Sequence, residues 1–233
     1  WGGIGLTLLP LVTYKWHLAG MGQGVEANIW GLYILPVGLS FYTFQALSMI
    51  IDTYRGTAPV VKKVSHYALF IAFFPQVLAG PILRGQEFWP QLVKPLKINV
   101  SQVGQALIFV LCGLFLKRVV GDQLGHLQNN VFVTPEIYHS STLWLAIIAS
   151  PWRFVGDFGG YALMAIGFGR LFGINLPHNF GPFWLATNGT QFWRNWHKTL
   201  TLWMMDYIFR PFFKCLGRTP FALFITCLVT FIA

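Results

Sequence analysis

Long apolar runs separated by short basic clusters constrain this chain more than any other feature. Only 10% of its 233 residues are charged, while 55% are hydrophobic and 17% are aromatic. A soluble domain carries about a quarter of its residues as charged side chains, and a helix of about 20 apolar residues crosses a bilayer. The composition therefore argues against a soluble globule, a disordered chain or a coiled coil. It predicts an all-α, polytopic integral membrane protein.

The net charge of +9 also points to a membrane rather than to nucleic acid. Cations at the ends of membrane segments set topology and attract anionic lipid headgroups. The basic residues of this chain stand between apolar runs, in four clusters: Lys62–Lys63, Lys94 and Lys97, Lys117–Arg118, and Arg210, Lys214 and Arg218. We therefore expect the lipid bilayer to be a partner, and we expect no nucleic acid.

Neither the cysteines nor the histidines have the spacing of a metal site. Cys112, Cys215 and Cys227 lie in or beside apolar runs without a CxxC pair, so we expect small buried hydrophobic residues. The histidines show no HxxxH or HExxH spacing, and no GxSxG motif is present. We expect no metal and no serine nucleophile of the hydrolase type.

The apolar segments differ in length, which predicts different relations to the bilayer. Runs of about a dozen residues dip into a membrane or lie buried in protein more often than they cross it. We expect spanning helices at 29–51, kinked at Pro36 and Gly38, and at 100–116, ending at Lys117–Arg118; a short re-entrant or buried run at 67–78; a helix at 143–172 broken at Pro151; an amphipathic helix at 191–209; and the start of a further span at 220–233.

These segments form one expected membrane domain over residues 1–233. The chain starts at Trp1 without an initiator Met, and it ends at Ala233 inside an apolar run. We therefore expect the domain to be incomplete at both ends.

Glycines in the 143–172 segment have the spacing of closely packed membrane helices. Gly156 and Gly160, and then Gly169 and Gly173, are each four residues apart. Small residues at this spacing let two helix backbones approach each other closely in lipid. The segment is therefore expected to pack tightly against another helix.

Asp157 and Tyr161 lie one helical turn apart in the same glycine-rich segment. Ionisable groups within a membrane are costly, and they usually face the protein interior or a water-filled cavity. Asp157 fits two roles equally well. It could orient a histidine or bind a polar substrate, or it could pair with Arg153 or Arg170 for structure alone.

The most informative stretch is QFWRNWHKTL at 191–200. On a helix, Trp193, Trp196 and His197 share an apolar, aromatic face, and Arg194 points elsewhere. A neutral imidazole on such a face can take a proton from a hydroxyl, because its ordinary pKa lies near working pH. A structural histidine, hydrogen-bonded to a neighbouring helix, fits the same spacing.

Asp206 and Arg210, near the end of the amphipathic segment, have the i,i+4 spacing of a helical ion pair. Such a pair stabilises a helix locally and requires no substrate. A structural ion pair is therefore the stronger interpretation at this position.

Seven sequence blocks occur in order along the chain: LPVGLSFYTFQ at 35–45, IDTYRG at 51–56, FFPQVLAGPI at 73–82, FWPQL at 88–92, DFGGY at 157–161, LPHNF at 176–180 and FWRNWH at 192–197. Together they resemble the membrane-bound O-acyltransferase (MBOAT) family. Within that family they are most similar to the bacterial branch that contains alginate O-acetyltransferase and the teichoic-acid D-alanyl transfer protein. The resemblance covers roughly residues 30–210.

This resemblance implies a multi-pass enzyme of the bacterial inner membrane, with a polar tunnel across its centre. An acyl thioester, either acetyl-CoA or an acylated carrier protein, would be presented from the cytoplasmic side as a substrate, with no bound cofactor. The acyl group, most simply acetyl, would pass to a hydroxyl of an extracytoplasmic polysaccharide or envelope polymer. A periplasmic or extracellular acyltransferase partner could relay it.

The resemblance also assigns roles to residues. His197 matches the family's histidine in the Trp-Arg-x-Trp-His block and is the expected catalytic residue, as a base, an oxyanion stabiliser or a guide for the acyl chain. The residues expected to line or support the substrate channel are Trp193, Arg194, Trp196, Asp157, Tyr161, Gln76 and Asp206.

Two departures from the family pattern matter. The family's second histidine lies in a later Gly-x-Trp-His block, which does not occur in these 233 residues, so we expect them to hold an incomplete catalytic set. Residues 206–213 read DYIFRPFF, whereas alginate-type enzymes follow Asp-Tyr with a Pro-Leu-Gly-Gly loop. This difference weakens the transfer of the alginate substrate to this chain.

Two hypotheses from other classes remain open on sequence grounds. A transporter or channel for a small polar solute also has interrupted helices and intramembrane charges such as Asp157 and Arg170. The second hypothesis is a non-catalytic scaffold of an envelope-modification complex. Loss of solute flux on deletion would indicate the transporter, whereas loss of a covalent acyl group would indicate the enzyme.

Overall fold

The computed structural model describes most of the chain, namely residues 2–5, 7–9, 12, 38–77, 80–94, 99–217 and 219–232. Within these ranges the regular structure is helical and there is no β-strand, which confirms the all-α prediction. The residues form two compact units. Unit 1 comprises Trp1–Leu78 with Ile82–Val93, and unit 2 comprises Ala79–Pro81 with Lys94–Ala233.

Among its described residues, unit 1 includes the helices α2 (Leu39–Tyr54), α3 (Val64–Ile71), α4 (Phe74–Val77) and α5 (Gly85–Val93), and residues 2–5, 7–9 and 12 are also helical. Its core is aromatic, since the buried ring of Phe88 lies 5.4 Å from that of Phe70 and 5.3 Å from that of Phe73. Gly85, the first residue of α5, lies directly against the Met49 sulfur of α2. A Cβ atom there would overlap this sulfur, so the Met49 side chain would have to move.

Helix α2 begins later than the sequence indicates. Gly38 precedes its first residue and has a φ of 83°, in the left-handed region that glycine adopts without a steric penalty. Gly38 therefore lies immediately before the first residue of α2. Pro36 and the rest of 29–37 lie outside the described residues. The short run at 67–78 is divided between α3 and α4.

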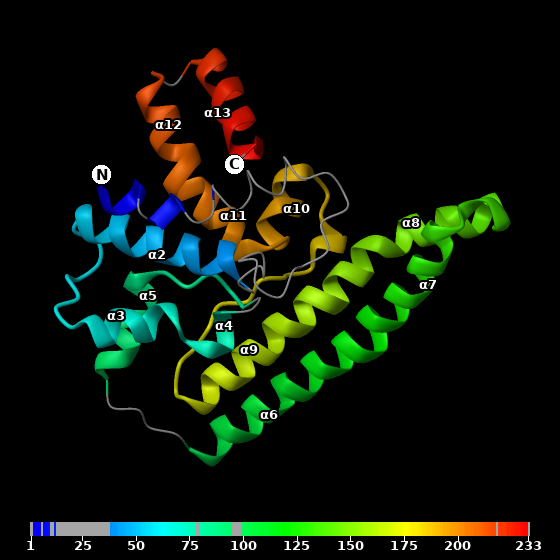
Figure 1. Ribbon diagram of the computed structural model, residues 1–233, viewed down its shortest axis with the longest axis horizontal. Coiled ribbons are helices and arrows are strands. Elements are labelled where there is room, and N and C mark those ends of the chain that lie inside the picture. The colour runs from blue at the N-terminus through cyan, green and yellow to red at the C-terminus, as the bar shows by residue number, and fades with distance from the viewer. Residues whose placement is uncertain are drawn as a thin grey trace, which may run out of the picture. The chain divides into compact units, whose positions relative to one another are not determined.

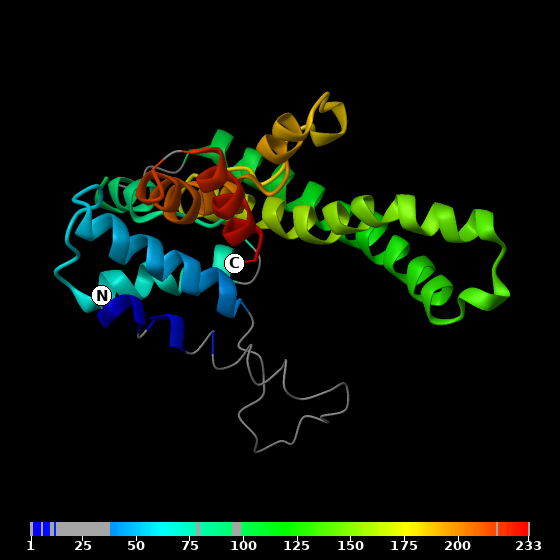
Figure 2. The same ribbon diagram turned by 90° about the horizontal axis from the view of Figure 1, so that it is seen from above.

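Unit 2 is dominated by two long helices connected by a short turn. The first runs through Val100–Val133 as α6 (Val100–Phe115), η1 (Leu116–Gly121) and α7 (Asp122–Val133); the second runs through α8 (Ser140–Phe154), η3 (Val155–Gly159) and α9 (Gly160–Leu171). Helix α6 packs against α9, and α7 packs against α8. Figures 1 and 2 both show the two long helices side by side.

Val100–Val133 is long and apolar enough to cross a membrane, and it is the one helix in the described part of the chain that meets this test. At 34 residues it does not end at Lys117–Arg118, so that predicted boundary is wrong. The charges remain inside the helix because Lys117 pairs with Asp122 one turn later and with Asp157 on the neighbouring helix. Paired charges can lie within a membrane helix at a much lower cost than isolated ones.

Pro151 does not break the second long helix, in contrast to the prediction. It lies within α8, and the π-helix η3 begins at Val155, one turn later. Proline removes one i→i−4 hydrogen bond, and a π-turn is one of the ways in which a helix accommodates such an irregularity.

The two long helices meet through glycine. A Cβ atom on Gly113 would lie 2.6 Å from the carbonyl oxygen of Gly160, and one on Gly121 would lie 2.7 Å from the backbone nitrogen of Asp157. A Cβ on Gly156 would overlap the backbone nitrogen of Gly121. These distances are shorter than van der Waals contact, so the backbones themselves touch, as predicted for Gly156 and Gly160.

The second predicted glycine pair does not join helices. Gly169 packs against Ile174 and Leu176 in the connection that follows α9. Gly173 has a φ of 70° just beyond the end of α9, where it lets the chain reverse. The spacing of these two glycines therefore reflects a helix terminus rather than a packing motif.

The remainder of unit 2 is made of short helices: η4 (Phe183–Leu185), α10 (Gly189–Asn195), α11 (Lys198–Met204), η5 (Met205–Phe209), α12 (Arg210–Cys215) and α13 (Pro220–Ile232). The predicted amphipathic helix at 191–209 is therefore wrong, because the chain breaks between Asn195 and Lys198. His197 has φ 41° and ψ 55°, a left-handed conformation that cannot continue a right-handed helix. The shared face proposed for Trp193, Trp196 and His197 is lost with it.

Replacing Gly113 by alanine tests the backbone contact. The methyl group would clash with Gly160, so we expect Gly113→Ala to destabilise the protein by about 1–3 kcal/mol. Gly104→Ala on the same helix is the matched control, because a Cβ atom there meets nothing within 4 Å. The control should be neutral or should stabilise by about 0.5–1 kcal/mol. Thermal unfolding of the two variants in detergent measures the difference, and equal unfolding temperatures would contradict the proposed contact.

Candidate functional site

His197 occupies the turn between α10 and α11. Among the described residues it is the only non-glycine residue with a positive φ. A left-handed conformation costs an ordinary L-residue roughly 1–2 kcal/mol, and it persists where the surrounding structure enforces it. Two backbone hydrogen bonds bracket this turn. The Gly181 N–H donates to Asn195 O at 2.9 Å, and the Lys198 N–H donates to Asn179 O at 2.8 Å.

The imidazole of His197 is half-buried among aromatic rings. Its centroid lies 4.7 Å from that of Phe158 in η3 and 6.5 Å from that of Phe180. The residue lies outside Val100–Val133, in a turn between two helices of seven residues each. Burial lowers the pKa of His197 to about 4. The side chain is therefore neutral at pH 7, the state in which an imidazole can accept a proton.

Trp196 organises the rings next to this histidine. It stacks on Phe154 at 5.2 Å and on Phe192 at 5.5 Å. Phe183 and Phe180 approach it edge-on, at 4.9 and 5.4 Å. Aromatic pairs in these geometries add to the gain from burial alone. Trp196 therefore fixes the chain that enters the His197 turn.

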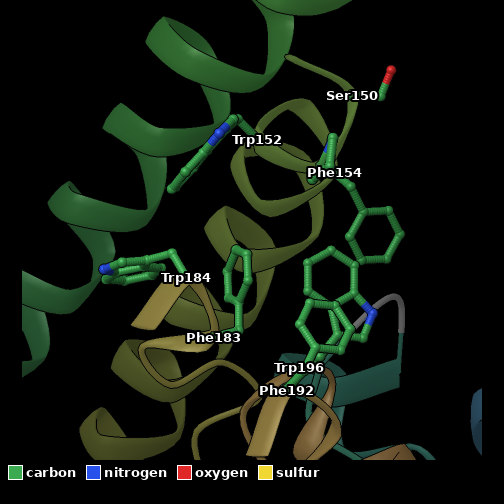
Figure 3. Close-up of a pocket in the computed structure, with 8 residues that line it drawn as sticks. Ser150, Trp152, Phe154, Phe183, Trp184, Phe192 and Trp196 are labelled. Carbon is green, nitrogen blue, oxygen red and sulfur yellow. The ribbon is translucent and has the colours of Figure 1, made fainter. Parts of the chain in front are cut away.

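Residues of this cluster also line an open apolar pocket of about 600 Å³. Figure 3 shows its mainly aromatic lining. The lining residues come from α8, η4, α10 and the position just after α10: Ser150, Pro151, Trp152, Phe154, Phe183, Trp184, Phe192 and Trp196. Its one hydroxyl, that of Ser150, donates to the Ala146 carbonyl oxygen at 3.0 Å. Such a lining suits an apolar group rather than a charged one.

Asp157 points to the neighbouring helix. Its carboxylate lies 2.6 Å from Lys117 Nζ and 3.8 Å from Arg153 Nε. Lys117 Nζ also pairs with Asp122 and lies 5.6 Å from the ring centre of Tyr161. The sequence-predicted residues Asp157 and Tyr161 thus meet at Lys117. The basic pair Lys117–Arg118 predicts only a membrane topology signal, and the position of Lys117 beside an apolar run was the available clue to this contact.

Arg170, the other partner considered for Asp157, is engaged elsewhere. Its Nη1 donates to Gln105 Oε1 at 2.8 Å, and its guanidinium lies 4.4 Å from the ring centre of Phe109. Both contacts tie the end of α9 to α6. Of the two partners predicted for Asp157, Arg153 is therefore confirmed and Arg170 is not, while Lys117 is a further partner that was not predicted.

The remaining predicted residues lie on α10, in η5 and in unit 1. Trp193 and Arg194 are exposed on α10. Asp206 pairs with Arg210 within η5 and α12, which confirms the predicted helical ion pair. Gln76 belongs to unit 1, where its buried side-chain amide donates to Phe70 O at 3.3 Å, an acceptor at the end of α3.

The cysteines differ from expectation. Cys112, Cys215 and Cys227 are all exposed rather than buried. Small hydrophobic residues on an outward helix face are nevertheless consistent with lipid contact, because that face meets hydrocarbon rather than water. No three His, Cys, Asp or Glu side chains gather into a possible metal site anywhere in the described ranges.

Comparison with known proteins identifies the family to which this chain is similar. The model of the membrane-bound O-acyltransferase (MBOAT) family matches residues 59–233. The "Probable alginate O-acetylase AlgI" of Pseudomonas aeruginosa is 34% identical over 186 residues, which are 80% of this chain and 35% of that protein. The "Peptidoglycan O-acetyltransferase" of Helicobacter pylori is 32% identical over 204 residues, 76% of this chain and 39% of its own length.

A third relative extends the range of acyl groups. The "Teichoic acid D-alanyltransferase" of Bacillus subtilis is 28% identical over 187 residues, 76% of this chain and 45% of that protein. The chain spans less than half the length of each of these three relatives. The family model covers well over half of the chain, and the resemblance of its sequence blocks is thereby confirmed. The chain belongs to the membrane-bound O-acyltransferase family.

Proposed function

We propose that this protein transfers an acyl group, most simply acetyl, from a cytoplasmic thioester to a hydroxyl of an extracytoplasmic polysaccharide or envelope polymer. Membership of the family supports acyl transfer within a membrane. The printed names of the relatives, which specify alginate, peptidoglycan and teichoic acid, support an envelope polymer as the acceptor. The donor would be acetyl-CoA or an acylated carrier protein, bound as a substrate.

The observation that carries the proposal is the neutral, half-buried imidazole of His197, held in a strained turn. Acting as a base, it takes the proton of the acceptor hydroxyl while that oxygen attacks the thioester carbonyl carbon. The carbon–sulfur bond then breaks, and the imidazolium returns the same proton to the departing thiolate. A positioned base contributes about 10²–10⁴ in rate when its pKa lies near the working pH. The lowered pKa of His197 keeps the imidazole deprotonated and also makes it a weaker base than an ordinary histidine.

We further propose a multi-pass arrangement in the bacterial inner membrane. Val100–Val133 is about 51 Å long, against a hydrocarbon core of about 30 Å. Because α8–α9 returns alongside it, a bilayer crossed by the first helix is also crossed by the second. Helices α10 and α11, with seven residues each, extend about 10 Å. They would therefore enter the bilayer without crossing it, as would α3 and α4.

One observation favours a second candidate, a transporter for a small polar solute. Lys117, Asp122 and Asp157 form an ion network inside a helix long enough to span. Intramembrane charges of this kind also mark solute pathways. Deletion of the gene separates the two functions, because a transporter mutant loses solute flux and keeps its envelope esters.

Substitution of His197 tests the enzymatic role. In the full-length protein we expect His197→Ala to abolish acyl transfer while the protein still accumulates in the membrane. His197→Asn is a second variant, because asparagine tolerates the left-handed conformation and lacks the imidazole. His126→Ala, at an exposed histidine of α7, is the matched control. Base-labile acyl groups on envelope polymers, measured by mass spectrometry in a complemented deletion strain, report the outcome. Normal ester content in both His197 variants would contradict the proposal.

The pH dependence follows from the lowered pKa. The deprotonated imidazole is the active base, and protonation of His197 occurs only as the pH falls through about 4 instead of 6.5. Between pH 8 and pH 5 we therefore expect no loss of transfer due to this group. The rate of acyl transfer in membrane preparations gives the profile. An acidic limb centred near pH 6.5 would show that His197 titrates as an ordinary histidine.

A further inference from the structure

Asn179 contacts both residues that follow His197. Its carbonyl oxygen accepts the Lys198 N–H at 2.8 Å, and its side-chain Oδ1 accepts the hydroxyl proton of Thr199 at 2.6 Å. Asn179 is only 1% exposed, and Thr199 is also buried. The hydroxyl contact is therefore shielded from water, which strengthens it.

The segment that carries Asn179 holds the His197 turn from both sides. Gly181, two residues further on, donates its N–H to Asn195 O at 2.9 Å, just before the turn. A Cβ atom on Gly181 would overlap the side chain of Asn195, so the chains run in direct contact. A left-handed histidine needs such enforcement, because relaxation into a right-handed helix would relieve its strain.

The side chain of Asn179 has one feature that lowers the stability of the fold. Its Nδ2 is buried and has no hydrogen-bond partner among the described residues. A buried donor left unsatisfied costs stability, and each such group in a folded protein calls for an explanation. The geometry offers an explanation: the Oδ1 atom of the same side-chain amide accepts the hydrogen bond from the Thr199 hydroxyl.

We propose that Asn179, together with Thr199, is a positioning residue that fixes the left-handed backbone of His197 and thereby directs its imidazole. The inference rests on the proposed function for the role of the imidazole. It adds a fixed geometry that the histidine does not possess by itself. Phe180 follows Asn179 in sequence and packs its ring against both Trp196 and His197. A displacement of Asn179 would therefore also move the Phe180 ring next to the imidazole.

Removal of the Thr199 hydroxyl tests this inference in the full-length protein. Thr199→Val keeps the volume and deletes the donor, whereas Thr199→Ser keeps the donor. We expect kcat to fall about 10- to 100-fold in Thr199→Val, because small displacements of a catalytic group have effects of this size. KM for the donor should stay within about twofold. Thr199→Ser should restore most of kcat.

Thr134→Val is the matched control. The Thr134 hydroxyl donates to Asn130 O at 3.2 Å in the turn after α7, away from His197. Its loss should leave kcat and KM unchanged. Where Thr199→Val fails to accumulate, Thr199→Ala replaces it, since alanine also lacks the hydroxyl and introduces no added bulk.

A spectroscopic readout keeps this test independent of activity. With ¹³C-labelled histidine, the His197 imidazole signal is assigned by its disappearance in His197→Asn. We expect Thr199→Val to shift or broaden that signal, and Thr134→Val to leave it unchanged. If kcat and the signal both stay at wild-type values in Thr199→Val, the positioning role is overturned. If the signal moves while His197→Asn retains full transfer, the positioning role stands and the proposed function of His197 fails.

Discussion

The backbone contact between the two long helices of unit 2 is the constraint on which the rest of that unit depends. Glycines at 113, 121, 156 and 160 let main-chain atoms meet where side chains would ordinarily separate the helices. This approach brings Lys117 within 2.6 Å of Asp157. It also places two π-helices, η1 and η3, against each other. π-turns within α-helices frequently accompany functional sites, because they turn side chains away from the regular helical positions.

One face of η3 serves the ion network, and another serves the histidine. Asp157 faces Lys117 on the neighbouring helix, while Phe158, the next residue, packs against His197. Phe154, one turn earlier, stacks on Trp196. The ion pair between Lys117 and Asp157 thereby holds η3 in place, and η3 carries the Phe158 ring that contacts His197. The charges contribute to the site by holding the scaffold, although no contact between Asp157 and substrate is required for that role.

Several features followed from the sequence because their physical causes are local. Scarcity of charge predicted helices for a bilayer, the i,i+4 spacing predicted the Asp206–Arg210 pair, and small residues four apart predicted the contact at Gly156 and Gly160. Helix boundaries were predicted less well. The basic pair Lys117–Arg118 predicts a helix end, yet Lys117 lies inside the helix because its acidic partners neutralise its charge. The partner on η3 is distant in sequence and has no local signature.

The candidate site shows where local information stops. The sequence by itself determined the family blocks, the helical character of the chain and the identity of His197 as the residue of interest. The apolar spacing of 191–209 predicted one continuous helix, because each residue there favours or tolerates helix. Only the tertiary structure decided that the helix breaks at His197, since the bonds that enforce the break come from Asn179 and Gly181 in a preceding segment. Strain at one residue is stable only when such contacts outweigh it, and no local pattern records them.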